Sequence, residues 1–441
     1  MKRYKIVYKN YSEAVEKLYA TVQSYLPYTL VCGKEEDDAY HTIWIGVTEG
    51  VCGYKIVVDE KQRVEITAED EANLLYAVSD FKNIYLPFNN SRDKDRVVDF
   101  YVRKPFLEPL KPVEISSCPR IKRRGLWTWG HTIYDYKKYI DNMVTLKLNT
   151  LIIWNDFVPV NIGDVIDYAH DHGVKIYLGF AWGWDTSDVK VNISDTLCLT
   201  EHVVNKYQKE YKNLSCDGIY FQSFTEKTAD NIDGVNIADA VITFVNRTAE
   251  KIFEMNPECE ILFGLHAMSV LERIEEFKKI DERISIIWED LGAFPYHNSP
   301  SETDGFTKTK ELNIKIRDLR DAGFGCVLKS NYRLNWFDFE HQAGPYIMGV
   351  TEEKVRKKKL DTVKPLLRTI QADWIKNAEL AKRLISDFNE DSIVTVLAED
   401  GMFEECITYP MALYAQMMWD CERPTEEIMH QAALMPDVDF V

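Results

Sequence analysis

From residue 123 onward, short apolar runs alternate regularly with longer segments in which apolar residues recur at helical spacing. The apolar runs are nearly continuous, as strands buried on both faces should be. The predicted strands are 124–130, 150–155, 174–182, 218–224, 260–266, 284–288, 324–330 and 392–398. The predicted helices are 134–147, 162–172, 201–211, 237–254, 271–279, 310–322, 352–389 and 409–420. Eight strands in regular alternation with helices predict a parallel sheet closed into a barrel.

An open, doubly wound sheet is the alternative architecture for such an alternating pattern. It would require a glycine-rich phosphate-binding turn after an early strand, and the chain has no G-x-G-x-x-G or P-loop sequence. We therefore predict the α/β fold class, in the form of a (β/α)₈ TIM barrel.

Before this alternation, residues 1–115 show a different pattern, which predicts a small α+β domain. Strands are predicted at 4–8, 41–46, 53–59 and 64–68, and helices at 12–25 and 69–85, with Ser12 as the N-cap of the first helix. Such strands and helices make a sheet with helices packed on it. A linker is predicted from Pro105, Pro109, Pro112 and Pro119, and the barrel domain is then expected to span residues 120–441.

Composition limits the class of protein. With 441 residues, of which 46% are hydrophobic, the chain is long enough for two or three domains with large cores. Its formal charge of -18 argues against nucleic acids and anionic membranes as partners. No apolar run approaches the roughly 18 residues of a membrane span, and the N-terminus lacks the apolar segment of a signal peptide.

The 9 cysteines are scattered along the chain, with no C-x-x-C pair. This pattern predicts free thiols, with neither a disulfide framework nor a zinc site. We therefore expect a cytoplasmic protein without a bound metal or other cofactor.

The residues that follow the predicted strands are candidates for chemistry, because barrels of this kind carry their functional groups at the carboxyl ends of the strands. The candidate binding residues there are Trp127, Trp129, His131, Trp154, Asn155, Asp156, Trp182, Trp184, Gln222, His266, Lys329, Tyr332 and Trp336. Core packing is the commoner role for any single tryptophan, but the clustering of the set indicates a binding surface. Aromatic walls with polar groups between them suit a sugar, whose C–H faces stack on indoles and whose hydroxyls need fixed partners.

Carboxylates stand among these residues, and glycoside hydrolysis uses two carboxyl groups that flank one bond. Glu226 ends the fourth strand and is the predicted general acid, because nearby aromatic residues could raise its pKa. The predicted partner is Glu289 or Asp290, of which only one should face the site, since adjacent strand residues point to opposite sides. Asp156 and Glu399 are reserve candidates. Local capping or ion pairing is the alternative role for Glu226, Glu289 and Asp290.

Three stretches of the chain resemble glycoside hydrolases of the β-hexosaminidase (family 20) and α-glucuronidase (family 67) type. They are 64–78, 123–127 together with 142–154, and 217–226, and the segment 409–420 also resembles the last helix of these enzymes. The resemblance implies a small α+β domain before a (β/α)₈ barrel. It also implies that Glu226 is the acid at the end of the fourth strand.

One departure concerns the residue before this acid. Family 20 enzymes end the fourth strand on Asp-Glu, and the Asp orients the acetamido group of the substrate. Here Thr225 precedes Glu226, which puts the acetamido-assisted mechanism in doubt. The pair is more similar to the Ser-Glu of family 67, which would imply an inverting mechanism.

We therefore expect an exo-acting glycoside hydrolase of hexosaminidase-like or glucuronidase-like type, acting on an oligosaccharide. A carbohydrate-binding barrel without catalysis is the alternative, and a carboxyl separation of about 5–10 Å would favour hydrolysis. A metal-dependent hydrolase using His131, Asp156 and His266 is a weaker third hypothesis, because no H-x-H or H-E-x-x-H sequence supports it. The expected partner is a carbohydrate substrate, and a homodimer is a further expectation.

Overall fold

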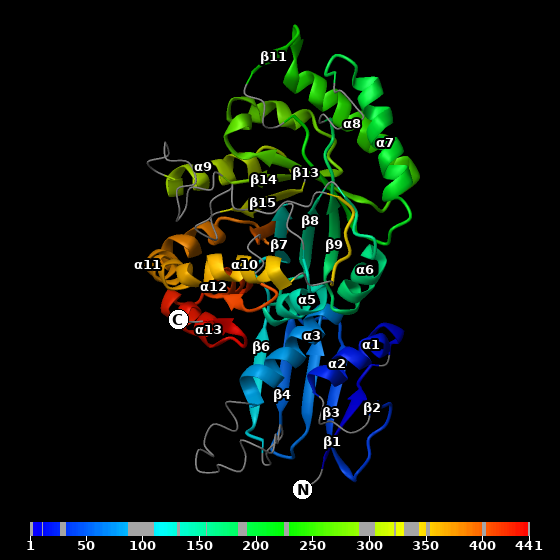
Figure 1. Ribbon diagram of the computed structural model, residues 1–441. Helices are drawn as coiled ribbons and strands as arrows, with labels where there is room; N and C mark the ends of the chain where they lie inside the picture. Colours follow the sequence, from blue (N-terminus) through cyan, green and yellow to red (C-terminus); the bar gives the residue numbers. More distant parts are fainter. Residues whose placement is uncertain are drawn as a thin grey trace.

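The computed structural model describes residues 3–10, 12–26, 32–86, 110–129, 133–155, 157–183, 192–224, 229–290, 305–321, 323–329, 344–349, 353–398 and 403–439. The chain forms an N-terminal α+β domain followed by a closed barrel of parallel strands surrounded by helices (Figure 1). The predicted fold class, a (β/α)₈ barrel preceded by a small α+β domain, is therefore confirmed.

The N-terminal domain is built on a six-stranded mixed sheet with the order β2-β1-β3-β5-β4-β6. Its strands are β1 (Arg3–Tyr8), β2 (Cys32–Gly33), β3 (Tyr40–Val47), β4 (Tyr54–Val58), β5 (Val64–Ala68) and β6 (Val113–Ser117). Its helices are α1 (Glu13–Lys17), α2 (Tyr19–Tyr25), α3 (Glu71–Asp80) and η1 (Phe81–Tyr85). Ser12 caps α1 as predicted, because its Oγ accepts a hydrogen bond from the Val15 N–H at 3.1 Å.

Strand β6 lies where the sequence predicted a linker. It is the edge strand of the sheet and pairs antiparallel with β4. Pro112 and Pro119 lie just outside the two ends of the strand, so neither removes a hydrogen bond of the sheet. Proline is tolerated at such positions next to an edge strand. The linker prediction is therefore wrong for residues 113–117, which form a strand between Pro112 and Pro119. Pro105 and Pro109 lie outside the described residues.

The barrel closes in the strand order β10-β13-β14-β15-β16-β7-β8-β9, and every neighbouring pair is parallel. The strands are β7 (Arg123–Trp129), β8 (Thr150–Trp154), β9 (Lys175–Gly179), β10 (Gly218–Phe221), β13 (Glu260–His266), β14 (Ile284–Glu289), β15 (Phe324–Leu328) and β16 (Ile393–Leu397). Two short pairs lie outside the barrel: β11 (Asn231–Ile232) with β12 (Val235–Asn236), and β17 (Ile407–Thr408) with β18 (Val438–Asp439).

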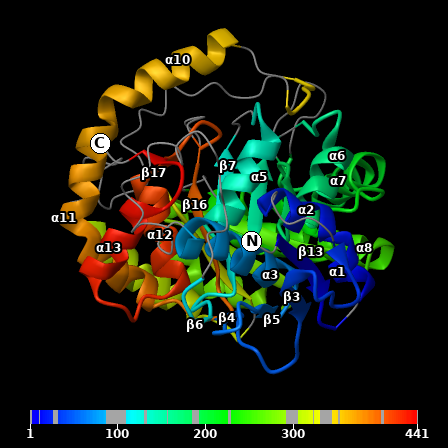
Figure 2. The same cartoon turned by 90° about the horizontal axis from the view of Figure 1, so that it is seen from below.

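Helices cover the outside of the barrel. They are α5 (Tyr136–Thr145), α6 (Ile162–Asp171), α7 (Thr196–Glu210), α8 (Ile237–Met255), η3 (Ala267–Lys279), α9 (Gly305–Arg317), α10 (Glu353–Val363), η5 (Lys364–Leu366), α11 (Leu367–Ser386), α12 (Tyr409–Trp419) and α13 (Thr425–Leu434). Figure 2 shows α11, α12 and α13 on one side of the molecule and α6, α7 and α8 on the other.

Strand β7 shows how alternating side-chain directions divide a strand between two environments. Trp127 belongs to the core inside the barrel, whereas Leu126 belongs to the core between strands and helices. At the start of the strand, Arg123 donates to Glu260 at 2.6 Å and also to the Tyr177 hydroxyl. The interior of the barrel is thus charged at the amino ends of these strands and aromatic at the carboxyl end of β7.

Arg124, the next residue of β7, ties the two domains together. Its side chain is fully buried and donates to the carbonyl oxygens of Ile121 at 2.5 Å and Lys147 at 2.8 Å. Its guanidinium lies over the rings of Trp419 at 4.9 Å and Tyr76 at 6.0 Å. Because Tyr76 is in α3 and Trp419 is in α12, one buried cation links the N-terminal domain, the first barrel strand and the last helix before α13.

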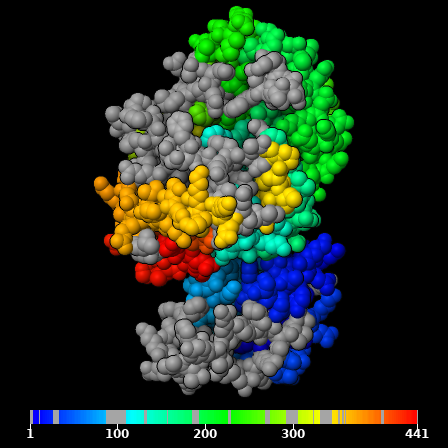
Figure 3. All heavy atoms as spheres, viewed as in Figure 1, coloured from blue at the N-terminus to red at the C-terminus, as the bar shows by residue number. Residues whose placement is uncertain are grey.

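A cavity of about 750 Å³ lies at the same junction, between η1 and β6 on one side and α12 and α13 on the other. Figure 3 shows the surface hollowed beneath α13. The charged groups in the cavity wall are paired, Lys147 with Asp80 at 2.7 Å and Arg423 with Asp420 at 3.2 Å. Pairing is what partly buried charges require, so these four groups need no further partner to be stable there.

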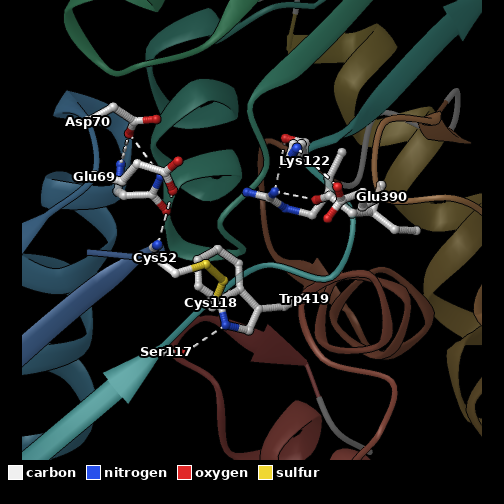
Figure 4. Close-up of a disulfide and its surroundings, with 12 residues drawn as sticks. Cys52, Glu69, Asp70, Ser117, Cys118, Lys122, Glu390 and Trp419 are labelled. Carbon is white, nitrogen blue, oxygen red and sulfur yellow. Dashed lines mark hydrogen bonds and ion pairs between the residues drawn. A yellow bond between two sulfur atoms is a disulfide. The ribbon is translucent and has the colours of Figure 1, made fainter. Parts of the chain in front are cut away.

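Cys52 and Cys118 form a disulfide that joins the segment before β4 to the residue after β6 (Figure 4). Their Cα atoms are 5.3 Å apart, because the pairing of β4 with β6 places Tyr54 opposite Ser117. The prediction that all cysteines are free thiols is therefore wrong. The cysteine argument for a cytoplasmic location loses its basis, and that location stays a prediction. Trp419 lies beside the disulfide and donates its indole N–H to Ser117 Oγ at 2.8 Å.

Within the described ranges, no helix combines the length and the hydropathy needed to cross a membrane. In the same part of the chain, no group of three or more His, Cys, Asp or Glu side chains is arranged to hold a metal ion. Two of the three hypothetical metal ligands, His131 and Asp156, lie outside the described residues. The homodimer stays a prediction.

Loss of the Cys52–Cys118 disulfide should destabilise the protein. The bond closes a loop with a sequence separation of 66 residues, and removing such a crosslink usually costs about 2–4 kcal/mol. We expect the double variant Cys52→Ser/Cys118→Ser to unfold at a lower urea concentration than the wild type, with an unchanged far-UV circular dichroism spectrum. The matched control is Cys198→Ser, which removes an exposed free thiol. Equal unfolding midpoints for the wild type and the double variant would contradict the prediction.

Candidate active site at the barrel mouth

The carboxyl ends of the barrel strands bring together most of the described candidate residues. They are Trp127 from β7, Trp154 from β8, Gln222 after β10, His266 from β13, Glu289 from β14 and Lys329 after β15. Asn155 follows Trp154 and points to the other side of the strand, where it bonds Tyr346 beside the outer core. Tyr220 of β10 lies in the centre of this group. Its ring packs edge-on against Trp154 at 5.3 Å and against Trp127 at 6.1 Å. These three rings form an aromatic floor to the barrel mouth.

The Glu289 carboxylate is the polar centre of the mouth and is only 1% exposed. Its Oε1 accepts hydrogen bonds from the Tyr220 hydroxyl at 2.5 Å and from the Gln222 side-chain amide. Its Oε2 forms an ion pair with the Lys329 ammonium at 2.7 Å. A buried carboxylate is tolerated only when it is paired and hydrogen-bonded, and these three donors meet that condition.

This arrangement requires a glycine in the neighbouring strand. Gly264 of β13 lies so close to Tyr220 that a Cβ at this position would sit 2.0 Å from the Tyr220 hydroxyl oxygen. Any other residue at position 264 would displace the phenol from Glu289. The glycine therefore belongs to the site, although it has no functional group of its own.

The local electrostatics keep Glu289 ionised. Burial alone would raise the pKa of its carboxyl group, but the charge of Lys329 and the hydrogen bonds from Lys329 and Tyr220 outweigh burial and lower it. Glu289 is therefore a carboxylate at neutral pH and has no proton to give.

His266 stands next to this ion pair and is held neutral. Burial, and then the positive charge of Lys329, lower the pKa of its imidazole to about 4, although the negative charge of Glu289 acts in the opposite direction. A neutral imidazole can both donate and accept a hydrogen bond, which suits a sugar hydroxyl. Its role in binding stays a prediction.

Asp290 lies on the other side of the barrel wall from Glu289. It is buried, and its Oδ1 accepts a hydrogen bond from the Lys329 backbone N–H at 3.0 Å. Its charge acts on Cys326 and Tyr414, which both belong to the core between strands and helices. Of the two predicted partners of Glu226, only Glu289 therefore faces the mouth, as the alternation of side chains along a strand requires.

The structure does not bring Trp182 to the mouth. It is fully buried between the barrel and the helices, where it stacks on Phe221 at 3.6 Å and contacts Phe244 edge-on at 6.2 Å. The reason is visible in the strand before it, because Tyr177 points into the barrel and Trp182, five positions later, points the other way. Trp129 differs from Trp182, since it is partly exposed beside the core inside the barrel.

One residue of the site was missed by the sequence analysis. Tyr220 could have been found, because it alternates with Gln222 along one strand and must share its direction. The partner of Asn155 could not have been found, because Tyr346, whose hydroxyl accepts a hydrogen bond from the Asn155 amide at 2.9 Å, follows no strand in the sequence.

Six predicted site residues lie outside the described residues: His131, Asp156, Trp184, Glu226, Tyr332 and Trp336, and the reserve Glu399 does too. Their roles stay predictions. The described chain stops two positions short of Glu226, at Phe224, which has a φ of 53°. Its ring packs on Gly183, where a Cβ would lie 2.5 Å from the ring. The end of the fourth strand is thus held against the segment that follows the third.

Comparison with known proteins supports the fold. No family model matches this sequence, and no curated protein sequence matches it. The chain is similar to a β-N-acetylhexosaminidase from Bacteroides fragilis NCTC 9343, with a TM-score of 0.59, 14% identity, and coverage of 98% of this chain and 90% of that one. It is also similar to a mutant Streptomyces plicatus β-hexosaminidase in complex with its product GlcNAc, with a TM-score of 0.56, 10% identity, and coverage of 100% and 94%.

A third solved structure is a GH138 enzyme targeting pectin rhamnogalacturonan II, with a TM-score of 0.54 and 9% identity. This chain is covered over 96% of its length but spans only 52% of that larger protein. At these identities the comparisons establish a shared architecture. The chain therefore has the hexosaminidase-like fold of these glycoside hydrolases, as its motifs predicted.

Because Lys329 and Glu289 form a buried ion pair, we expect the single variant Lys329→Met to be less stable than the double variant that also changes Glu289. Lys329→Met should destabilise the protein by about 3–5 kcal/mol, because it leaves a buried carboxylate without its cation. Adding Glu289→Gln should recover a large part of this loss, because the amide is neutral. Urea unfolding of the wild type, Lys329→Met and the double variant measures these differences in stability. Lys175→Met is the control, because Lys175 is partly exposed and its loss should cost about 1 kcal/mol or less. A double variant no more stable than Lys329→Met would contradict the pairing.

The neutral state of His266 predicts a loss of stability in mild acid. Between the unfolded pKa of about 6.5 and the folded pKa of about 4, the unfolded chain binds one more proton than the native protein. Stability should therefore fall as the pH falls through this window, by roughly 3 kcal/mol at its lower end. Urea unfolding from about pH 7 to about pH 4 should show a flatter profile for His266→Gln than for the wild type. His202→Gln, on α7, is the control, and parallel profiles for wild type and His266→Gln would refute the assignment.

Proposed function

We propose that the protein is a glycoside hydrolase that cleaves a glycosidic bond of an oligosaccharide, as an exo-acting enzyme of hexosaminidase-like or glucuronidase-like type. The observation that carries this proposal is the barrel mouth, where an ionised Glu289 and its donors stand on an aromatic floor. A sugar needs this combination, because its hydroxyls require fixed polar partners and its C–H faces pack on aromatic rings. The shared architecture with known glycoside hydrolases supports the same conclusion.

The aromatic residues divide into two roles in this proposal. Trp127 and Trp154 are almost fully buried under the polar cluster, and they serve as the floor that holds Tyr220 in place. Trp129 is more exposed and lies on the same face of β7 as Trp127, so it is the described tryptophan that can stack on a sugar ring.

Glu289 binds and orients the substrate in this proposal. Its two oxygens already receive bonds from Tyr220, Gln222 and Lys329, which lowers its reactivity as a nucleophile. The pair of Glu289 and Lys329 can instead accept from one sugar hydroxyl and donate to another.

Glu226 is the proposed general acid. In the proposed reaction its proton passes to the glycosidic oxygen, and the bond between that oxygen and the anomeric carbon breaks. Water adds to the anomeric carbon and loses a proton to the solvent, and the Glu226 carboxylate takes up a proton from the solvent for the next turnover. For this reaction Glu226 must hold a proton while Glu289 is ionised, so the two carboxyl groups need opposite protonation states. The lowered pKa of Glu289 fits the ionised member of such a pair. Thr225 stands where family 20 has its orienting Asp, so we propose a reaction that does not depend on a substrate acetamido group.

A carbohydrate-binding barrel without catalysis is the second candidate, and one observation favours it. The charge of Glu289 is already compensated by Lys329 at 2.7 Å, so this carboxylate is not free to act alone. The two candidates share the same mouth and differ only in turnover. A protein that binds a glycoside in calorimetry, but releases no product from it, would favour the binding function.

Replacement of the acid should depend on the leaving group. We expect Glu226→Gln to lose at least about 10²-fold in kcat/KM, the usual contribution of a general acid. The loss should be larger for alkyl glycosides than for nitrophenyl glycosides, because nitrophenolate leaves without needing a proton. The measurement is a panel of both substrate types at constant pH.

Glu201→Gln is the matched control for this experiment, because Glu201 is exposed on α7. It should leave the rates unchanged for every substrate. An active enzyme that tolerates Glu226→Gln, or that loses the same factor on both substrate types, would remove Glu226 from the role of general acid.

A further inference from the structure

The side chains around Glu289 form a receptor for one carboxylate. The Tyr220 hydroxyl and the Gln222 amide both donate to its Oε1. The Lys329 ammonium lies 2.7 Å from its Oε2. One cation and two neutral donors, aimed at the two oxygens of a single carboxylate, are what a binding site for a carboxylate needs. The protein fills this site with a side chain of its own.

This receptor belongs to the barrel mouth. Glu289 stands two positions after Ile287, which faces the inside of the barrel, so it shares that direction. Lys329 stands two positions after Val327, which also faces the inside. His266 is the direct partner of Glu289 in the pairing of β13 with β14, and it is only partly buried. A sugar that reaches His266 therefore lies next to Glu289.

His266 adds no positive charge to this side of the mouth. Burial, and then the charge of Lys329, lower the pKa of its imidazole to about 4, so it is neutral at neutral pH. The ionised Glu289 compensates the ammonium of Lys329, and the three side chains together carry no net charge. A sugar carboxylate bound here would have to share Lys329 with Glu289. Two carboxylates at one buried cation repel each other, which disfavours such a complex.

We propose that Glu289 is a specificity-determining residue, which occupies the carboxylate receptor of the mouth and thereby restricts the protein to sugars without a carboxylate. A uronic acid, which has a carboxylate where a hexose has its hydroxymethyl group, would meet Glu289 on the donors that it needs. The hydroxyls of a neutral sugar can instead donate to Glu289 and accept from Lys329. The inference rests on the proposed function, and it favours the hexosaminidase-like over the glucuronidase-like substrate.

A panel of 4-nitrophenyl glycosides tests the inference on the full chain. Glucosides and glucuronides of both anomers are matched pairs that differ only at C6, and galactosides with galacturonides are a second set. N-acetylglucosaminides extend the neutral members of the panel. We expect the best neutral substrate to exceed the best uronide by at least about 10-fold in kcat/KM, because like charges placed side by side oppose binding. A wild type that prefers a uronide would overturn the inference.

Glu289→Gln should change this selectivity, because the amide keeps the size of the side chain but leaves Lys329 without its counter-charge. We expect the ratio of kcat/KM between neutral substrates and uronides to fall at least about 10-fold. Glu289→Gln/Lys329→Met removes both charges, so its ratio should lie between those of the wild type and Glu289→Gln. This double variant carries the test if the single variant does not fold. Damage to the fold alone would slow both substrate classes by the same factor and leave the ratio unchanged.

Glu201→Gln is the matched control. It removes an exposed carboxylate on α7 and changes the charge of the chain by the same amount as Glu289→Gln. Its ratio should equal that of the wild type. An equal shift of the ratio in Glu201→Gln and Glu289→Gln would assign the selectivity to the overall charge of -18, and would remove Glu289 from this role.

Calorimetry separates this inference from the proposed function. If the wild type hydrolyses no member of the panel, the methyl glycosides of the same sugars are titrated into it. Tighter binding of the neutral glycosides would then overturn the proposed hydrolysis and support the role of Glu289. Tighter binding of a uronide, or a ratio that is the same in wild type and Glu289→Gln, overturns the role of Glu289 alone. A protein that neither hydrolyses nor binds any of these glycosides overturns both.

Discussion

The barrel mouth depends on one constraint, which is that the buried carboxylate of Glu289 must be compensated. An uncompensated charge at this depth would cost several kcal/mol. Tyr220 and Gln222 reach it from β10 and Lys329 reaches it from the end of β15. The ends of β10, β14 and β15 must therefore lie at the same level of the barrel for these side chains to meet. Position 264 must also be glycine, because a Cβ there would clash with the Tyr220 hydroxyl. The polar residues of the mouth neutralise this charge directly, and Trp127 and Trp154 hold in place the Tyr220 ring that donates to it.

Local sequence patterns predicted the features that depend on local physics. The eight barrel strands were found because strands buried on both faces are continuous apolar runs. Glu289 and Asp290 lie on opposite sides of the wall because side chains alternate along a strand. The same rule, applied along the third strand, would have placed Trp182 in the outer core. The error came from treating every tryptophan near a strand end as part of the mouth.

Contacts between distant segments were beyond reach of the sequence. The Cys52–Cys118 bond follows from the register of β4 against β6, and β6 itself was masked by its flanking prolines. Tyr346 reaches Asn155 only because the segment 344–349 binds beside the end of β8. Trp419 completes the core of the N-terminal domain from the last part of the chain. In each case the two contacting residues are brought together by the packing of distant segments, and their spacing in the sequence does not predict the contact.

The Cys52–Cys118 disulfide closes a covalent loop in the chain. The backbone from Cys52 to Cys118 and the bond between the two sulfurs form one ring, which contains α3 and the strands β4, β5 and β6. A single proteolytic cut inside that ring opens it without releasing a fragment. After such a cut the barrel would stay covalently joined to the strands β1 and β3, and a reductant would be needed as well to break the remaining covalent link between the two parts.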